Sequence, residues 1–208
     1  MRELFIVRHG ETEWNVANRL QGRLDSPLTA RGKQQADRNG RLLFEVGQVN
    51  ELWVSPSGRT LDTARIINTH VQAKLQRFEE LMERDAGDWS GKTVTEIVAS
   101  FPSAWAERQA DAYRFRAPGG ENLEDMLVRV KPVLTALQQS SADSIALITH
   151  GLMSKVLVQA LLDLEPAETV TLRHPNNLVY RLTFKAAGIE THHFLDGREE
   201  IEGLLRLP

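Results

Sequence analysis

Residues 4–10 read Leu-Phe-Ile-Val-Arg-His-Gly: an apolar run, residues 4–7, is followed by Arg8, His9 and a glycine. A second apolar run, residues 145–149, is followed in the same way by His150 and a glycine. Such runs are typical of buried strands, and a helical pattern follows each of them. Because ligands bind beyond the carboxyl ends of the strands in open α/β sheets, we expect both histidines to lie at one crevice.

Strand and helix patterns alternate along most of the chain. The clearest helical patterns are residues 122–139, with Asn122 placed to cap, and residues 152–162. Residues 179–194 form two alternating segments around Gly188, which is typical of a terminal β-hairpin. The alternation predicts an α/β fold with a mostly parallel central sheet and helices on both faces. Strand patterns lie at residues 3–8, 51–55, 75–78, 144–149, 178–184 and 189–194.

Residues 84–120 have a different composition. This section contains Trp89, Trp105, many charged residues and no clear strand pattern. We interpret it as a helical lid insertion over the edge of the sheet and as a natural place for substrate selectivity. Residues 1–208 are expected to form a single domain, because the chain has the length of one domain with a full core.

The composition argues against several classes of protein. A net charge of −3 gives no electrostatic case for a nucleic-acid partner or a membrane surface. The chain has no cysteine, which excludes disulfides and thiolate chemistry. No apolar run approaches the roughly 20 residues of a membrane span, and the first run is too short for the apolar core of a signal peptide. We therefore expect a soluble, cytoplasmic protein.

Two arginines, two histidines and a carboxylate lie at strand ends or in adjoining loops. Arg8 and His9 end the first strand, and Arg59 follows the second. Glu83 precedes a loop rich in glycine, and His150 ends the fourth strand. Arginine binds phosphate oxygens bidentately, and a neutral imidazole can attack phosphorus and carry a covalent intermediate. This set of groups predicts phosphoryl chemistry.

Several longer motifs carry a resemblance to a known family. The chain contains, in this order, LFIVRHGETEWN, GRLDSPLTARGKQQA, SPSGRTLDTA, ERDAGDWSGKT, PGGEN and ALITHG. With these motifs it resembles the histidine phosphatase superfamily, phosphoglycerate mutase-like branch, over nearly its whole length, and PGGEN resembles the phosphatase-type members. The resemblance implies a three-layer α/β/α sandwich and a phosphohistidine mechanism that needs no metal and no cofactor.

The resemblance also implies a role for each matching residue. His9 matches the nucleophile that becomes phosphorylated. Arg8, Arg59 and His150 match the rest of the phosphate pocket. Glu83 matches the general acid.

Further candidates are weaker. Asn15 matches an additional phosphate contact of the family, and the turn at Gln21 and Gly22 matches another. No metal site is expected, because His192 and His193 are neighbours on a predicted strand and their side chains point to opposite faces.

The implied roles agree with the chemistry of the groups. His9 must be neutral to attack phosphorus, and the neighbouring arginine charges disfavour its protonated form. Glu83 must be protonated to give a proton to the leaving oxygen, and the dianionic phosphate of the substrate favours that state by like-charge repulsion. The nearby carboxylates that could take this role instead are Glu79, Glu80 and Asp85.

The expected function is a metal-independent phosphomonoesterase that acts on a small phosphorylated metabolite. A cofactor-dependent phosphoglycerate mutase is the alternative, but it needs added cationic groups above the pocket. The segment between Glu83 and His150 is shorter than the mutase-type insertion, and its basic residues are scattered. A non-catalytic phospholigand-binding protein is an alternative of another class, disfavoured because the nucleophile, the acid and the arginines are all present.

The substrate and the oligomeric state stay open at this point. Sugar phosphates, phosphoglycerate, α-ribazole phosphate and a broad range of esters all fit the motifs. Arg114 and Arg116 are candidates for contact with an anionic substrate, whereas Trp105, Tyr113 and Phe115 would favour a bulkier, partly apolar leaving group. A homodimer is one of the open oligomeric states.

Overall fold

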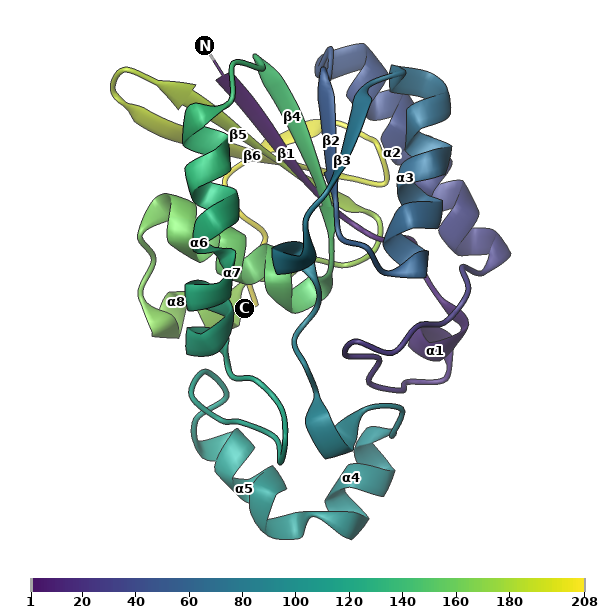
Figure 1. Ribbon diagram of the computed structural model, residues 1–208, viewed down its shortest axis with the longest axis vertical. Helices are drawn as coiled ribbons and strands as arrows, with labels where there is room; N and C mark the ends of the chain where they lie inside the picture. Colours follow the sequence, from purple (N-terminus) through teal and green to yellow (C-terminus); the bar gives the residue numbers. More distant parts are fainter. Residues whose placement is uncertain (1, 208) are drawn as a thin grey trace.

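One mixed sheet of seven strands forms the centre of the molecule (Figure 1). The computed structural model describes residues 2–207. The strands are β1 (Arg2–Arg8), β2 (Glu51–Val54), β3 (Lys74–Arg77), β4 (Ser144–Thr149), β5 (Leu178–Lys185), β6 (Gly188–Leu195) and β7 (Glu200–Glu202). Their order in the sheet is β3-β2-β4-β1-β5-β6-β7. The first four in this order run parallel to one another, and the remaining pairings are antiparallel.

The expectation of a mostly parallel sheet is therefore only partly correct. Lys185 at the end of β5 pairs with Gly188 at the start of β6, so residues 186–187 alone join the two strands. So short a loop can link only antiparallel strands, because a parallel pair needs a crossover of a dozen or more residues. Since β5 also pairs antiparallel with β1, this half of the sheet is antiparallel.

Helices cover both faces of the sheet, which confirms the three-layer α/β/α sandwich (Figure 1). On one face lie α2 (Ala30–Val46) and α3 (Gly58–Val71), and on the other lie α6 (Leu123–Gln139) and α7 (Gly151–Leu162). Short elements complete the fold: α1 (Glu13–Val16), η1 (Glu79–Leu81), η2 (Gly87–Trp89), α4 (Val94–Ser100), α5 (Pro102–Ala110) and α8 (Pro166–Thr171).

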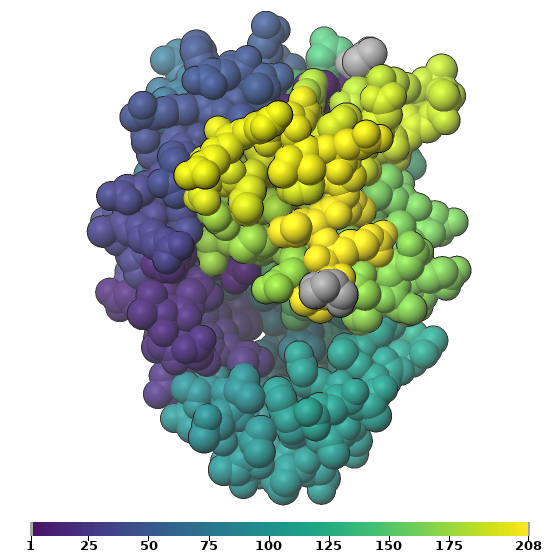
Figure 2. All heavy atoms as spheres, turned by 180° about the vertical axis from the view of Figure 1, so that it is seen from behind, coloured from purple at the N-terminus to yellow at the C-terminus, as the bar shows by residue number. Residues whose placement is uncertain are grey.

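The section 84–120 contains η2, α4 and α5 and no strand. It lies beyond the carboxyl ends of the parallel strands, on the same side as α1 (Figure 1). It has a small core of its own, in which the rings of Trp89 and Phe115 stack with centroids 4.9 Å apart. Seen from behind, the surface is hollowed between this teal section and the purple N-terminal segment (Figure 2).

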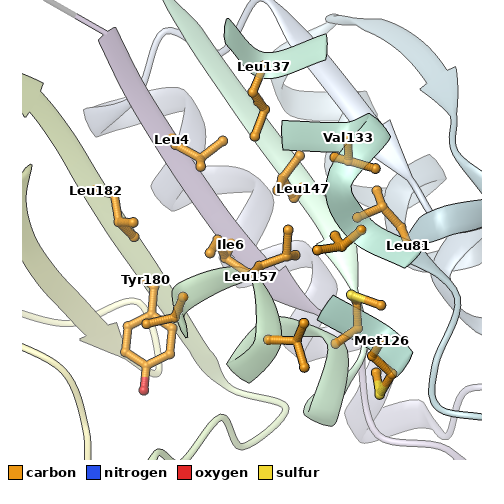
Figure 3. Close-up of a cluster of buried hydrophobic side chains, with 14 of the residues drawn as sticks. Leu4, Ile6, Leu81, Met126, Val133, Leu137, Leu147, Leu157, Tyr180 and Leu182 are labelled. Atoms are coloured by element: carbon orange, nitrogen blue, oxygen red, sulfur yellow. The ribbon is translucent and has the colours of Figure 1, made fainter. Parts of the chain in front are cut away.

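Strand β1 is the centre of both hydrophobic cores. Its side chains alternate, so that Leu4 and Ile6 pack toward α6 and α7 (Figure 3), while Phe5 and Val7 pack toward α2 and α3. All four side chains are essentially inaccessible to solvent. A strand buried on both faces has no polar position, which explains the continuous apolar run that ends at His9.

Most of the expected elements are confirmed. Each of the six expected strands is present, the expected hairpin turns at residues 186–187 just before Gly188, and the two expected helices correspond to α6 and α7. The exposed strand β7 was not expected, because Glu200, Ile201 and Glu202 have no buried face. Within residues 2–207, no helix combines the length and apolar composition needed to cross a membrane.

Candidate active site

The two histidines lie side by side, as expected from the strand pattern. Strands β1 and β4 are parallel neighbours in which Arg8 pairs with Thr149, so the next residue of each strand is a histidine. The rings of His9 and His150 meet edge to face with centroids 5.4 Å apart. Both residues are buried, with 3% and 0% of their surface exposed.

His9 is held in one tautomer. Its Nδ1 atom lies 2.8 Å from the carbonyl oxygen of Gly10. Because a carbonyl oxygen only accepts, Nδ1 carries the proton and Nε2 of the neutral ring keeps a free lone pair. Burial lowers the pKa of His9 well below its ordinary value, and the charges of Arg8 and Arg59 lower it further. The ring is therefore neutral at physiological pH and can act as a nucleophile through Nε2.

His150 is oriented by a residue that the sequence did not single out. Its Nε2 atom lies 2.7 Å from Oγ of Ser55, which follows β2. Its Nδ1 atom is buried and has no hydrogen-bond partner among the described residues. Burial lowers the pKa of His150 well below its ordinary value, and the charges of Arg59 and Arg8 lower it further. His150 is therefore a second neutral imidazole beside His9.

Arg8 lies against the start of α7. Its Nη1 atom donates to the carbonyl oxygen of His174 at 2.9 Å, whereas its buried Nε atom has no partner among the described residues. A Cβ atom at Gly151 would lie 3.3 Å from Cζ of Arg8, so the glycine allows the guanidinium its close approach. Burial lowers the pKa of Arg8, although the charge of Glu83 opposes this effect.

Arg59 is fixed by the loop that follows α1. Its Nη1 atom donates to the carbonyl oxygen of Leu24 at 2.7 Å and to Oδ1 of Asp25 at 3.0 Å. Its Nη2 atom donates to the carbonyl oxygen of Gly22 at 2.9 Å. A Cβ atom at Gly58 would come within 2.1 Å of Oδ2 of Asp25, so a larger residue there would displace the Asp25 carboxylate. Gly22 therefore positions Arg59 through its carbonyl group, and Asp25 is a functional candidate missed in the sequence.

The carboxylate of Glu83 lies at the N-terminus of α7. It accepts hydrogen bonds from the backbone N–H groups of Leu152 at 3.1 Å, Met153 at 3.2 Å and Arg84 at 2.8 Å. Glu83 also lines the pocket that contains His9. The three alternative carboxylates considered from the sequence do not line that pocket.

The weaker candidates line the same pocket and share one partner. Asn15 accepts from the backbone N–H of Thr12 at 3.1 Å, and Nε2 of Gln21 donates to Oγ1 of Thr12 at 2.9 Å. The Oε1 atom of Gln21 is buried without a partner within the described chain. A further residue, Asn176, donates to the backbone carbonyl oxygen of His9 at 2.8 Å and was not predicted. Through these hydrogen bonds, Thr12 and Asn176 stabilise the segment after β1 that lines the pocket.

These residues surround a pocket of about 320 Å³. Arg8, His9, Asn15, Gln21, Gly22, Arg59 and Glu83 all line it, whereas His150 lies behind the wall. Arg84 lines it as well and was not predicted. A second hollow of about 520 Å³ adjoins this pocket and shares Arg8, Glu83 and Leu152 with it. A neutral imidazole surrounded by arginines is chemically suited to receive a phosphoryl group.

The substrate contacts expected from residues 105–116 are wrong. Arg114 and Arg116 form ion pairs with acidic neighbours on the surface and do not line the pocket. Tyr113 and Phe115 are buried in hydrophobic clusters, and Trp105 packs at the edge of one of them. Charge and aromatic content alone could not distinguish these structural contacts from contacts with a ligand.

Comparison with known proteins identifies the same family that the sequence motifs resemble. A family model described as histidine phosphatase superfamily (branch 1) matches residues 4–196. The 6-phosphofructo-2-kinase/fructose-2,6-bisphosphatase of Aquarana catesbeiana is 35% identical over 189 residues, which are 90% of this chain and 38% of that protein. The chain thus spans less than half the length of the curated relatives of this type that it matches.

Two solved structures are similar over almost the whole chain. Bacillus stearothermophilus YhfR superposes with a TM-score of 0.83 at 30% identity, covering 96% of this chain and 98% of that one. The mycobacterial glucosyl-3-phosphoglycerate phosphatase in complex with VO3 superposes with a TM-score of 0.79 at 27% identity, covering 98% and 97%.

Proposed function

The chain belongs to the histidine phosphatase superfamily, and from this membership and the geometry of His9 we propose that it is a phosphomonoesterase acting through a phosphohistidine. One observation carries the proposal: the neutral ring of His9 donates through Nδ1 to Gly10, which leaves Nε2 free in a pocket lined by Arg8 and Arg59. Two similar proteins, a 6-phosphofructo-2-kinase/fructose-2,6-bisphosphatase and a glucosyl-3-phosphoglycerate phosphatase, support hydrolysis as the reaction.

In the first step, the lone pair on Nε2 of His9 attacks the phosphorus atom of the ester. The bond from phosphorus to the ester oxygen breaks, and Glu83 gives its proton to that leaving oxygen. In the second step, water attacks the phosphohistidine, the P–N bond breaks, and Glu83 takes a proton from the water. Inorganic phosphate leaves, and His9 returns to its neutral state.

The arginines offset the charge of the transferred group. Arg59 is buried and Arg8 is half-buried, and both cations are held in fixed positions by carbonyl groups, Arg59 also by Asp25. Fixed positive charges stabilise the equatorial oxygens of a transferring phosphoryl group. Lewis-acid metal ions perform the same task in other hydrolases. We therefore propose that hydrolysis needs no metal ion.

Phosphorus NMR tests this function against its alternatives. The protein is incubated with 3-phosphoglycerate, a trace of 2,3-bisphosphoglycerate and EDTA, and in parallel with glycerol 3-phosphate and EDTA. Inorganic phosphate is expected from at least one ester. Accumulation of 2-phosphoglycerate with little free phosphate would establish a mutase instead. Binding of these esters without any turnover would establish a phospholigand-binding protein.

The histidine variants make the test specific. His9→Ala is expected to abolish release of phosphate. His192→Gln on β6 is the matched control, because His192 lies outside the pocket. Activity that is lost in EDTA and restored by a divalent metal would contradict the metal-independent mechanism.

A further inference from the structure

Arg84 is a buried cation in the pocket wall whose guanidinium has no acceptor among residues 2–207. Only 6% of its surface is exposed, and it lines the same pocket as His9. Within residues 2–207, no hydrogen bond or ion pair joins its guanidinium group to a carbonyl or carboxylate oxygen, and the residue donates only through its backbone N–H. Burying a charged group without a partner is costly, so such a group is normally matched by an opposite charge.

The other arginines of the pocket differ from Arg84 in this respect. Arg59 has Asp25 and two carbonyl oxygens. Arg8 donates to one carbonyl oxygen. Arg19 donates to a carbonyl oxygen and to Glu96. Arg84 therefore stands out as the pocket arginine none of whose guanidinium donors has an acceptor within the described chain.

The neighbours of Arg84 do not neutralise it by contact. The carboxylate of Glu83 is occupied by three backbone N–H groups and forms no ion pair with the Arg84 guanidinium. Arg108 on α5 adds a second cation nearby; it lies over the ring of Trp105 at 5.0 Å and has no ion pair in the described chain. Burial lowers the pKa of Arg84, the charge of Glu83 raises it, and the charge of Arg108 lowers it.

We propose that Arg84 binds a second acidic group of the substrate, a carboxylate or a second phosphate carried by the leaving group. In this arrangement, which rests on the proposed function, Arg8 and Arg59 hold the phosphate that is hydrolysed, and Arg84 holds the distal anion. The guanidinium has donors in a planar fork that matches either kind of acidic group. A volume of about 320 Å³ is at the small end of the range for ligand pockets, so a compact metabolite fits both positions.

Two matched pairs of esters test this assignment. One pair is 3-phosphoglycerate and glycerol 3-phosphate, which differ in a carboxylate. The other is fructose 1,6-bisphosphate and fructose 6-phosphate, which differ in a phosphate. The wild-type protein is expected to prefer the acidic member of at least one pair, by kcat/KM. Arg84→Gln is expected to reduce that preference at least tenfold, mainly through KM for the acidic ester, and Arg84→Lys is expected to retain part of it.

Controls separate substrate binding from other roles. Arg114→Gln removes an exposed arginine paired with Asp111 and Glu124, and it should leave both preferences unchanged. If Arg84 acted only by positioning Glu83, its substitution would lower kcat for both members of a pair equally and shift the pH profile. Thermal unfolding of Arg84→Gln and Arg84→Lys shows whether each variant is folded.

The outcomes distinguish this inference from the proposed function. Hydrolysis by the wild type with equal losses for both members of each pair, or with no loss, would overturn the role of Arg84 and leave the phosphatase standing. Absence of hydrolysis of all four esters by the wild type would overturn the proposed function, and the role of Arg84 with it.

Discussion

The Nε2 atom of His150 lies 2.7 Å from the Oγ atom of Ser55, and this hydrogen bond links the ends of two neighbouring strands. Ser55 is itself fixed, because its backbone N–H donates to Ile148 at 3.0 Å and its carbonyl oxygen accepts from Thr60 at 2.8 Å. The orientation of the second histidine is therefore built into the sheet rather than into a mobile loop.

Replacing Ser55 with alanine tests that relationship. Ser55→Ala leaves a buried ring nitrogen without its partner, which costs about 1–3 kcal/mol of stability. We expect a lower melting temperature and a decrease in kcat/KM, because His150 can rotate away from the phosphate pocket. Calorimetry and steady-state kinetics measure the two effects. Unchanged kcat/KM in a folded variant would show that the hydrogen bond does not position His150.

Glu83→Gln should affect esters according to their leaving groups. An alkoxide leaving group needs a proton, so hydrolysis of an alkyl phosphate should slow by about 10²–10⁴-fold. p-Nitrophenyl phosphate, whose leaving group is stable as an anion, should lose much less. The control is Glu80→Gln, which removes a nearby carboxylate that does not line the pocket. Equal losses for both esters would argue against Glu83 as the general acid.

Gly151→Ala separates stability from phosphate binding. Alanine favours a helix over glycine by about 1 kcal/mol, and Gly151 is the first residue of α7, so stability should be unchanged or higher. The new Cβ atom would lie 3.3 Å from Cζ of Arg8, so the guanidinium would have to shift slightly away from α7. We expect weaker inhibition by inorganic phosphate and a higher KM. A stable variant with wild-type KM would contradict the role given to this close approach.

Low pH should destabilise the protein through its buried histidines. Burial lowers the pKa of His174 to about 3, despite the hydrogen bond to the Leu178 carbonyl group. Unfolded histidine titrates near pH 6.5, so between these values the unfolded chain binds a proton that the native chain does not. This contribution is fully present above about pH 6.5 and is lost as the pH falls toward 3, at about 1.4 kcal/mol per pH unit.

Urea unfolding of His174→Gln measures that contribution. Between pH 6 and pH 5, the wild type should lose roughly 1 kcal/mol more free energy of unfolding than the variant does. His9 and His150 remain in both proteins, so their effect cancels. Identical pH dependence in the two proteins would show that His174 has the same pKa in the native and unfolded states.

The sequence was sufficient for the parts of the site that lie at strand ends. His9 and His150 follow apolar runs, and parallel strands bring their carboxyl ends to one edge, so their proximity was predictable. Ser55, Asp25 and Asn176 were not predicted. They act through single long-range hydrogen bonds, which no periodic pattern in the sequence reports.

The errors in the fold and at the pocket have a similar origin. The direction of β5 depends on its pairing with β1, which is a tertiary choice, although the hairpin itself was visible around Gly188. Arg84 and Arg114 are chemically alike in the sequence. One is buried in the pocket without a partner and the other is paired at the surface, and only the structure separates them.

The central claim is that the phosphoryl group passes through Nε2 of His9. The most direct test is rapid quenching of the wild-type protein during turnover in EDTA, followed by mass spectrometry under alkaline conditions. We predict an acid-labile phosphoryl group on the peptide that contains His9, absent from His9→Ala. Turnover without any phosphorylated protein, or with the group on another residue, would contradict this account.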